Sequence, residues 1–235
     1  MSRTVEVCLT PELMSLYDVK DSVVVVVDVL RATSCMVAGL GSGVASITPF
    51  AELEACRAMK AVGYRIAGER GGEKVEGFDL GNSPYEYMAE ENQGQKIATT
   101  TTNGTRAIAL SRRSQGVYIG AFLNLTAVAT ALRQRSEDIL ILCAGWKGRF
   151  NLEDTLFAGA LIAALEGNAT PTDDAAIAAL SLYQSQQDSL QAFLRQSAHA
   201  QRLSGPGAAR DIELCLTLDQ YDVVPVLKGN ELMPL

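Results

Sequence analysis

Small polar and charged residues follow an apolar run at four places along the chain. The first place, residues 28–33 after the valines of residues 23–27, combines a carboxylate, a guanidinium and a hydroxyl. The others are residues 99–105, 120–124 and 143–154. In an open parallel sheet the loops after the strands meet at one edge, where helix N-termini favour anions. The four segments therefore predict one composite site for a phosphorylated or otherwise anionic small molecule, with a hard metal ion.

Asp28 stands where the apolar run 23–27 ends, shortly before Arg31 and Thr33. A carboxylate at this position faces the crevice, where Mg²⁺ takes one or two carboxylates plus substrate oxygens. Asp also caps helices routinely, which is the alternative interpretation. The apolar run before it and Arg31 after it favour function, so Asp28 is predicted to be a Mg²⁺ ligand or a nucleophile toward phosphorus. The D-x-D pattern of aspartyl-phosphate hydrolases is missing, because Leu30 occupies the third position.

Residues 99–105 place hydroxyl groups, Asn103 and Gly104 before a predicted helix at 106–112. This composition is typical of a phosphate cradle, although the chain contains no Walker A motif. A threonine-rich strand with an Asn-Gly turn is the alternative. Four consecutive threonines would, however, leave alternate hydroxyls facing the core without partners.

Two further segments add charged candidates. The glycine-rich residues 68–84 contain Glu69 and Arg70, and a loop of this length is uncommon in a compact domain unless it serves function. Glu153 and Asp154 open a later predicted helix. They could complete a metal site, although acids in a first turn also stabilise a helix through its dipole.

Cys143 and His199 carry two other chemistries. The spacing from Cys143 to Arg149 matches the C-x5-R pattern of cysteine phosphatases, which need a thiolate in a loop of N–H groups. Leu142 and Phe150 stand where those enzymes usually carry His and Ser or Thr, so we interpret Cys143 as a small core residue. His199 is the only histidine and lies far along the chain from the loops, which argues against phosphohistidine or zinc chemistry.

The elements that must position these residues follow from periodicity and breakers. The unalternating valine run predicts a strand covered on both faces of a parallel sheet. We predict an α/β fold: a three-layer, mostly parallel sheet with helices on both faces, a helical C-terminal elaboration after about residue 167, and a single domain over residues 1–235. Further strands are expected at residues 44–48, 64–67 and 222–227, the last at a sheet edge because of Pro225, and helices at residues 33–40, 51–62, 152–166, 172–201 with a break near 185–188, and 208–218.

Composition limits the partners. The net charge is −7 and the 20 basic residues are spread along the chain, so we expect no nucleic-acid partner. The longest apolar run is too short to span a bilayer, so no membrane partner is expected. Five scattered cysteines without a C-x-x-C pair predict reduced thiols and a cytoplasmic location. The expected partner is a small anionic phosphorylated substrate, and a homodimer is left open.

The ordered set of motifs resembles the 2-phosphosulfolactate phosphatase family across nearly the whole chain. The resemblance implies an α/β fold peculiar to that family. It also implies a Mg²⁺-dependent hydrolase that removes phosphate from 2-phospho-3-sulfolactate, giving sulfolactate, a step toward coenzyme M. The residues that carry it are the segments 28–33, 68–72, 77–84, 100–105, 143–145 followed by Glu153-Asp154, and 222–226.

Motifs and resemblance together predict metal-assisted phosphomonoester hydrolysis. A non-catalytic sensor of a phosphorylated metabolite is the rival function, since binding needs donors but no metal. The predicted catalytic residues are Asp28, Arg31 and Arg70; the Mg²⁺ ligands are Asp28 with Glu69, Glu153 and Asp154; and the substrate-binding residues are Thr33, Asn82, Ser83, Thr101, Thr102, Asn103, Gly104, Thr105 and Asn124.

Overall fold

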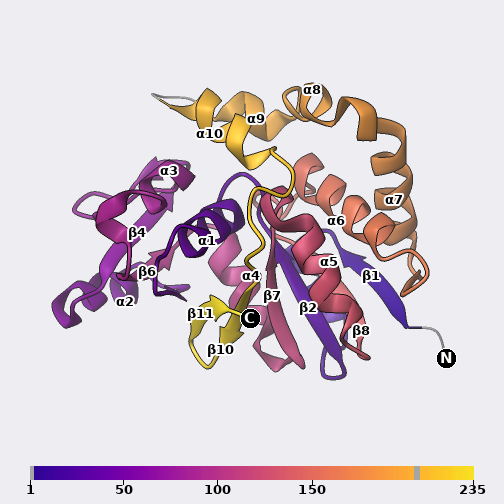
Figure 1. Cartoon of the computed structure of the whole chain (residues 1–235), viewed down its shortest axis with the longest axis horizontal. Coiled ribbons are helices and arrows are strands. Elements are labelled where there is room, and N and C mark those ends of the chain that lie inside the picture. Colours follow the sequence, from indigo (N-terminus) through magenta and orange to yellow (C-terminus); the bar gives the residue numbers. More distant parts are fainter. Residues whose placement is uncertain (1–2, 204–206) are drawn as a thin grey trace.

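Eleven strands form one sheet in this computed structural model, which describes residues 3–203 and 207–235 (Figure 1). Their order across the sheet is β5-β4-β6-β3-β11-β10-β7-β2-β8-β1-β9. The strands are β1 (Thr4–Cys8), β2 (Ser22–Val27), β3 (Ser46–Pro49), β4 (Arg65–Arg70), β5 (Glu73–Lys74), β6 (Lys96–Thr100), β7 (Gly116–Gly120), β8 (Asp138–Cys143), β9 (Thr170–Pro171), β10 (Pro225–Lys228) and β11 (Glu231–Pro234).

The sheet consists of two parallel blocks joined by an antiparallel hairpin. Strands β4, β6 and β3 pair in parallel, as do β7, β2, β8, β1 and β9. The hairpin β10–β11 lies between them, with β11 paired to β3 and β10 paired to β7. The predicted mostly parallel α/β sheet is confirmed.

Helices cover both faces of the sheet. Helices α1, α3 and α4 contribute to the core on one face, and α5, α6 and α7 to the core on the other. The helices are α1 (Ala32–Gly41), α2 (Leu53–Ala58), α3 (Pro84–Tyr87), α4 (Gly104–Leu110), α5 (Leu125–Arg133), α6 (Leu152–Ala164), α7 (Asp174–Gln186), α8 (Leu190–Leu194), α9 (Ala198–Arg202) and α10 (Ala208–Cys215), with 3-10 turns at Pro11–Leu16, Met59–Val62, Glu90–Asn92, Ser111–Arg113, Phe122–Asn124 and Gln187–Ser189.

Strand β2 shows why the valine run does not alternate. Val23 and Val25 pack into the core that contains Phe157, whereas Val24 and Val26 pack into the core that contains Met36. Each of the four valines is fully buried. A strand with a helical layer on each face needs apolar residues on both sides, which confirms the prediction of a doubly covered strand.

Strand β10 corrects one expectation. The prediction that Pro225 lies at a sheet edge is wrong, because β10 lies inside the sheet between β11 and β7. Pro225 is the first residue of β10, and the pairing to β7 is a single pair, Val226 with Tyr118. Proline is tolerated at the first position of a strand, since the missing N–H leaves the rest of the ladder intact.

The C-terminal helices form a cap over the carboxyl edge of the sheet. In Figure 1 the cap runs from α7 across α8 and α9 to α10, above the ends of the central strands. The predicted break near residues 185–188 is confirmed, since α7 ends at Gln186. Within residues 3–203 and 207–235, no helix has the length and apolar character required to cross a bilayer.

Helix α7 is attached to the rest of the fold through a close approach to α6. A Cβ atom on Gly159 would lie 2.0 Å from the carbonyl oxygen of Ala179. Backbone atoms cannot yield as side chains do, so Gly159→Ala is expected to destabilise the protein by at least about 2 kcal/mol. Urea denaturation measures this difference.

Gly39→Ala is the matched control for Gly159→Ala. A Cβ on Gly39 in α1 would meet the Tyr87 side chain at 3.1 Å, which can shift slightly. The expected change is within about 1 kcal/mol, because the gain in helix propensity offsets the crowding. Equal destabilisation by the two substitutions would contradict the packing argument.

Candidate active site

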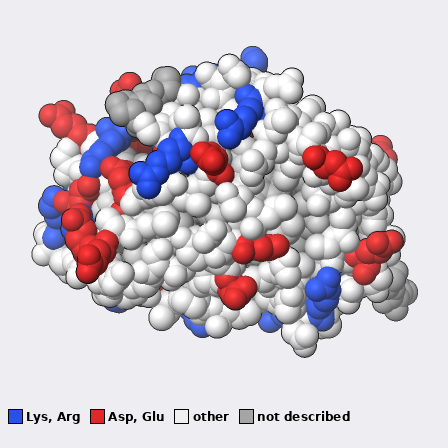
Figure 2. Space-filling view, turned by 45° about the horizontal axis from the view of Figure 1, so that its top comes forward, with Lys and Arg blue, Asp and Glu red and all other residues white. Residues whose placement is uncertain are grey.

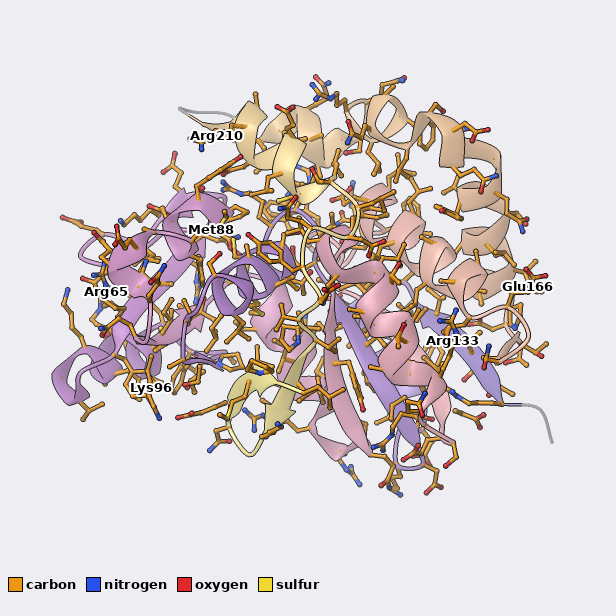
Figure 3. All side chains as sticks on the ribbon, in the orientation of Figure 1. Arg65, Met88, Lys96, Arg133, Glu166 and Arg210 are labelled. Atoms are coloured by element: carbon orange, nitrogen blue, oxygen red, sulfur yellow. The ribbon has the colours of Figure 1, made fainter. Side chains whose placement is uncertain are left out.

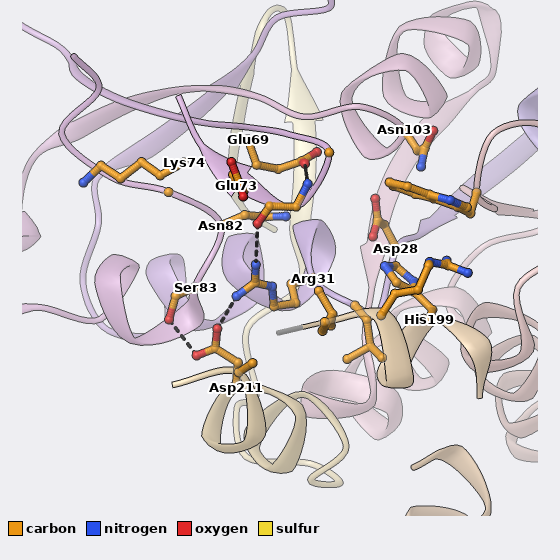
Figure 4. Close-up of a pocket in the computed structure, with 18 of the residues that line it drawn as sticks. Asp28, Arg31, Glu69, Glu73, Lys74, Asn82, Ser83, Asn103, His199 and Asp211 are labelled. Carbon is orange, nitrogen blue, oxygen red and sulfur yellow. Dashed lines mark hydrogen bonds and ion pairs between the residues drawn. The ribbon is translucent and has the colours of Figure 1, made fainter. Parts of the chain in front are cut away.

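A cavity of about 690 Å³ opens at the carboxyl edge of the sheet, beneath the helical cap. The loops after β2 and β6 and the turn between β4 and β5 form its floor, and α9 and α10 supply its cover. Figure 4 shows Asp28, Arg31, Glu69, Asn103 and His199 around it. Segments far apart in the sequence therefore meet around this one cavity, although three antiparallel pairings separate β2 from β4 and β6 in the sheet, so their blocks run in opposite directions.

Asp28 is buried on the cavity floor with 7% of its surface exposed. Its backbone N–H donates to the Thr33 hydroxyl at 3.0 Å, and the Ala32 N–H donates to its Oδ1 at 3.4 Å. A Cβ on Gly104 would lie 2.8 Å from Asp28 Oδ2. Gly104 therefore permits the start of α4 to approach the carboxylate, and Thr33 holds the loop rather than facing the cavity.

Burial and neighbouring charges shift the pKa of Asp28 upward. Burial raises the pKa of Asp28 to about 6; the charge of His199 lowers it and the carboxylate of Glu69 raises it. A carboxyl group in this state is a functional-site candidate, because a structural cap has no need of a raised pKa.

Glu69 lines the cavity but is already engaged by two backbone donors. Its Oε2 accepts from the Gly72 N–H at 2.8 Å and its Oε1 from the Thr102 N–H at 2.7 Å. These bonds hold the turn after β4 against the loop after β6. Glu69 therefore builds the cavity wall, whatever else it binds.

Asp154, like Glu69, accepts hydrogen bonds from backbone N–H groups of two different loops. Its Oδ1 accepts from the Val29 N–H at 2.9 Å and its Oδ2 from the Gly145 N–H at 3.1 Å. Burial and the neighbouring Glu153 raise the pKa of Asp154 well above its usual range. Asp154 thus ties the loop after β2 to the loop after β8 and does not line the cavity.

Arg31 links the cavity floor to the cap. Its guanidinium donates to Asp211 of α10, whose other carboxylate oxygen accepts from the Ser83 hydroxyl at 2.7 Å. The Arg31 side chain is 12% exposed and that of Asp211 is 5% exposed. Figure 4 shows this chain of contacts. Arg210 of α10, labelled in Figure 3, has its guanidinium 3.6 Å from the ring centroid of Tyr85.

The hydroxyl-rich loop is partly structural and partly open to the cavity. Thr101 and Thr105 bond each other: the Thr105 N–H donates to Thr101 Oγ1 at 3.2 Å, and Thr105 Oγ1 donates to the Thr101 carbonyl at 3.0 Å. Asn103 lines the cavity and donates to the Gly145 carbonyl at 3.0 Å. Two buried oxygens, Thr102 Oγ1 and Asn82 Oδ1, have no hydrogen-bond partner among the described residues.

Arg70 and Asn124, both predicted site residues, are also absent from the lining of the cavity. Arg70 does not line the cavity; it donates to the Glu69 carbonyl at 2.7 Å and to Thr100 Oγ1 at 3.0 Å. Alternation along β4 accounts for this, since Glu69 faces the cavity and its neighbour must face away. Asn124 is fully buried and donates to the Val223 carbonyl at 2.9 Å, which fixes the chain before β10.

His199 was missed as a site residue, and the structure brings it to the cavity. It lies on α9, and its Nδ1 is 2.6 Å from Oε1 of the fully buried Glu153. Glu153 itself does not line the cavity. His199 is remote from these loops in the sequence, but the cap folds back over them and brings His199 to the same cavity (Figure 1). The only feature of the sequence that could have marked His199 as a site residue is that it is the only histidine.

Metal ligation needs few protein groups here. Among residues 3–203 and 207–235, no group of three or more His, Cys, Asp or Glu side chains is arranged to hold a metal ion. Mg²⁺ binds through one or two carboxylates completed by substrate oxygens and water. Asp28, Asn82 and Asn103 all line the cavity, and their side chains carry hard oxygen donors of that kind.

Cys143 lies at the end of β8 inside the apolar core and is fully buried. Burial, together with the neighbouring Asp154, raises the pKa of the Cys143 thiol well above its usual value. A thiol held protonated is a poor nucleophile. All five cysteines are buried and free of disulfides.

Cys143→Ser is expected to retain most phosphatase activity, because serine fits the same small pocket and no thiolate is used. EDTA, and not thiol alkylation, is expected to inhibit the unaltered protein. Phosphate release by both proteins measures this. Complete loss of turnover in a folded serine variant would restore the cysteine mechanism.

Charged side chains on the face seen in Figure 2 gather mainly at one end, beside the cap. Basic and acidic groups are interspersed there and form no continuous basic stripe on that face. Mixed charge of this kind suits a local anion site better than a nucleic-acid surface.

Comparison with known proteins decides the family. The family described as 2-phosphosulpholactate phosphatase matches residues 8–230. The chain belongs to this family. Relatives named probable 2-phosphosulfolactate phosphatase are found in Thermotoga petrophila, 43% identical with 86% of this chain and 88% of the relative covered, and in Caldanaerobacter subterraneus, 38% identical with 91% and 90% covered. A relative of the same name in Gloeobacter violaceus is 39% identical, with 94% of each chain covered.

Membership of the 2-phosphosulfolactate phosphatase family confirms the resemblance drawn from the motifs. It also confirms the enzyme class, a phosphomonoester hydrolase. Four of the segments that carried the resemblance, residues 28–33, 68–72, 77–84 and 100–105, contribute side chains or backbone to the lining of the cavity, whereas residues 222–226 do not.

Proposed function

We propose that this chain is a Mg²⁺-dependent phosphatase that hydrolyses 2-phospho-3-sulfolactate, or a related small 2-phospho acid, to sulfolactate and phosphate. The observation that carries the proposal is the buried Asp28 carboxylate, which shares a cavity with the nearly buried guanidinium of Arg31. Family membership supports the reaction and the substrate.

Phosphoryl transfer asks mainly for positioning and charge neutralisation. Asp28 would hold Mg²⁺, which would neutralise charge on the phosphoryl oxygens when bound. Arg31 presents a guanidinium suited to a phosphoryl or sulfonate group. Asn103 and the backbone of residues 102–104 border the position beside Asp28 where the phosphoryl group would lie. Asp28 acts either as the nucleophile or as the metal ligand alone.

Among the described residues, the cavity is lined by three cationic side chains and five carboxylates, so binding of a polyanionic substrate would depend on those cations and on bound Mg²⁺. At neutral pH, 2-phospho-3-sulfolactate carries about four negative charges, from its phosphate, carboxylate and sulfonate. The cationic residues Arg31, Lys74 and Arg202 line the cavity, whereas Arg70 does not. We assign to Arg202 of the cap the charge that Arg70 was expected to supply.

A phosphate-release assay with an aryl phosphate tests the proposed reaction. Turnover is expected with Mg²⁺ and is expected to stop when EDTA removes the metal. Binding of phosphate without turnover at any Mg²⁺ concentration would instead identify a sensor of phosphorylated metabolites.

A further inference from the structure

The cap brings a histidine and a buried carboxylate to the cavity as a pair. Glu153 is fully buried, and its Oε1 lies 2.6 Å from His199 Nδ1. This hydrogen bond occupies Nδ1 and fixes the orientation of the imidazole ring. The other oxygen, Glu153 Oε2, is buried and has no hydrogen-bond partner among the described residues. Glu153 therefore has one specific interaction, which is to orient His199.

Packing restrains the imidazole further. Its ring lies 5.6 Å from the Trp146 ring, centroid to centroid, with 33° between their planes. The Arg202 guanidinium lies 5.0 Å from the Trp146 centroid. Since Nδ1 is bound to Glu153 and the ring lines the cavity, Nε2 is the nitrogen left to meet a ligand; it makes no hydrogen bond within the described part of the chain.

We infer that His199 is a catalytic residue of the proposed phosphatase: its Nε2 protonates the oxygen that leaves phosphorus, and Glu153 positions the ring. This inference rests on the proposed function. The position suits the role, because Asp28 and His199 both line the same cavity.

The proton balance of the step is complete. When the bond between phosphorus and the ester oxygen breaks, its electron pair goes to the ester oxygen, which takes the proton from Nε2 and leaves as the alcohol. Water supplies the new oxygen on phosphorus. The proton released by that water returns to Nε2, so His199 ends the cycle unchanged. An alkoxide leaving group needs this proton, whereas an aryl oxide that is stable as an anion does not.

Leaving-group dependence is the kinetic test. For 2-phospholactate, an alkyl monoester, His199→Gln is expected to lower kcat by about 100-fold or more. For p-nitrophenyl phosphate, kcat is expected to change little. Glu153→Gln is expected to act in the same direction with a smaller loss, and Gln201→Ala, an exposed position on the same helix, to act on neither substrate. Equal losses on both substrates, or none on either, would overturn the inference.

A second measurement needs no turnover. Because His199 is the only histidine, ¹⁵N NMR of the imidazole reports this one ring without ambiguity. Inorganic phosphate is expected to shift the Nε2 resonance, and Glu153→Gln is expected to shift Nδ1. An Nε2 resonance that ignores saturating phosphate would overturn the inference by itself. Absence of turnover on both substrates by the unaltered protein would refute the proposed function, and the NMR titration would still decide whether His199 faces the anion.

Discussion

Asp28→Asn is expected to lower kcat by at least about 1,000-fold, which is roughly 4 kcal/mol in the barrier. Asparagine keeps the size of the side chain and its bond to the Ala32 N–H, but it removes the negative charge that would hold Mg²⁺ or attack phosphorus. Steady-state phosphate release at saturating Mg²⁺ measures the effect, and the circular dichroism spectrum is expected to be unchanged. Turnover within about tenfold of the unaltered protein, or 1.4 kcal/mol, would reduce Asp28 to a helix cap.

The same substitution has an opposite effect on stability. The pKa of Asp28 rises from its ordinary 3.8 to about 6 in the folded protein. The folded state therefore binds more protons than the unfolded state between these values, and stability is lost as the pH rises through this window. At neutral pH the buried charge costs about 3 kcal/mol, which asparagine removes.

Thermal unfolding in EDTA checks this second effect. Near neutral pH the Asp28→Asn variant is expected to melt at the same or a higher temperature than the unaltered protein. The gap is expected to shrink as the pH falls from about 6 to 3.8 and to vanish below that range, where Asp28 is protonated in both states. A variant that melts at a lower temperature at neutral pH would show that the Asp28 charge stabilises the folded state, which contradicts the expected stability cost of this buried charge.

Arg31→Met is the second substitution with a large expected effect. It removes the guanidinium that we assign to the substrate anion, so kcat/KM is expected to fall by about 100-fold or more, some 2.7 kcal/mol. It also leaves the buried Asp211 carboxylate with the Ser83 hydroxyl as its remaining hydrogen-bond donor. The protein is therefore expected to lose about 3 kcal/mol of stability as well.

Two variants separate these effects of Arg31. Asp211→Asn weakens the same contact to the cap but keeps the guanidinium, so it is expected to lose stability with a smaller loss of kcat/KM. Arg65→Met removes an exposed Arg–Glu pair at the far end of β4 and is expected to change neither quantity by much. If Asp211→Asn lowered kcat/KM as far as Arg31→Met, Arg31 would serve only to hold the cap.

The floor of the site was predictable because it follows from local rules. A strand buried on both faces must end near the carboxyl edge, so Asp28 could be placed from the valine run alone. Asp28 follows β2 and Asn103 follows β6, and both side chains line the same cavity. Their meeting depends on the tertiary arrangement of two strand blocks that run in opposite directions. Thr33 was correctly placed in the loop after β2, but its hydroxyl accepts a hydrogen bond from the Asp28 backbone N–H and does not face the cavity.

The rest of the site depends on long-range geometry that residue spacing does not encode. The sequence gives no reason to prefer Glu69 or Arg70, because they are charged neighbours in the same glycine-rich segment. The alternation of side chains along β4 decides that Glu69 faces the cavity. His199 and Asp211 reach the site because the cap folds back across the sheet, and neither follows a strand. Loop composition identified the floor of the cavity, whereas its cover required the structure.

The proposed reaction is hydrolysis of a small polyanionic phosphate ester in this cavity. The most direct test compares kcat/KM for 2-phospho-3-sulfolactate with that for a neutral sugar phosphate, by phosphate release in the presence of Mg²⁺. A clear preference for the phosphosulfolactate is expected. A sugar phosphate has no anionic group besides its phosphate, so Arg31 and Arg202 could not both be paired with the substrate. Equal kcat/KM values for the two esters would contradict it.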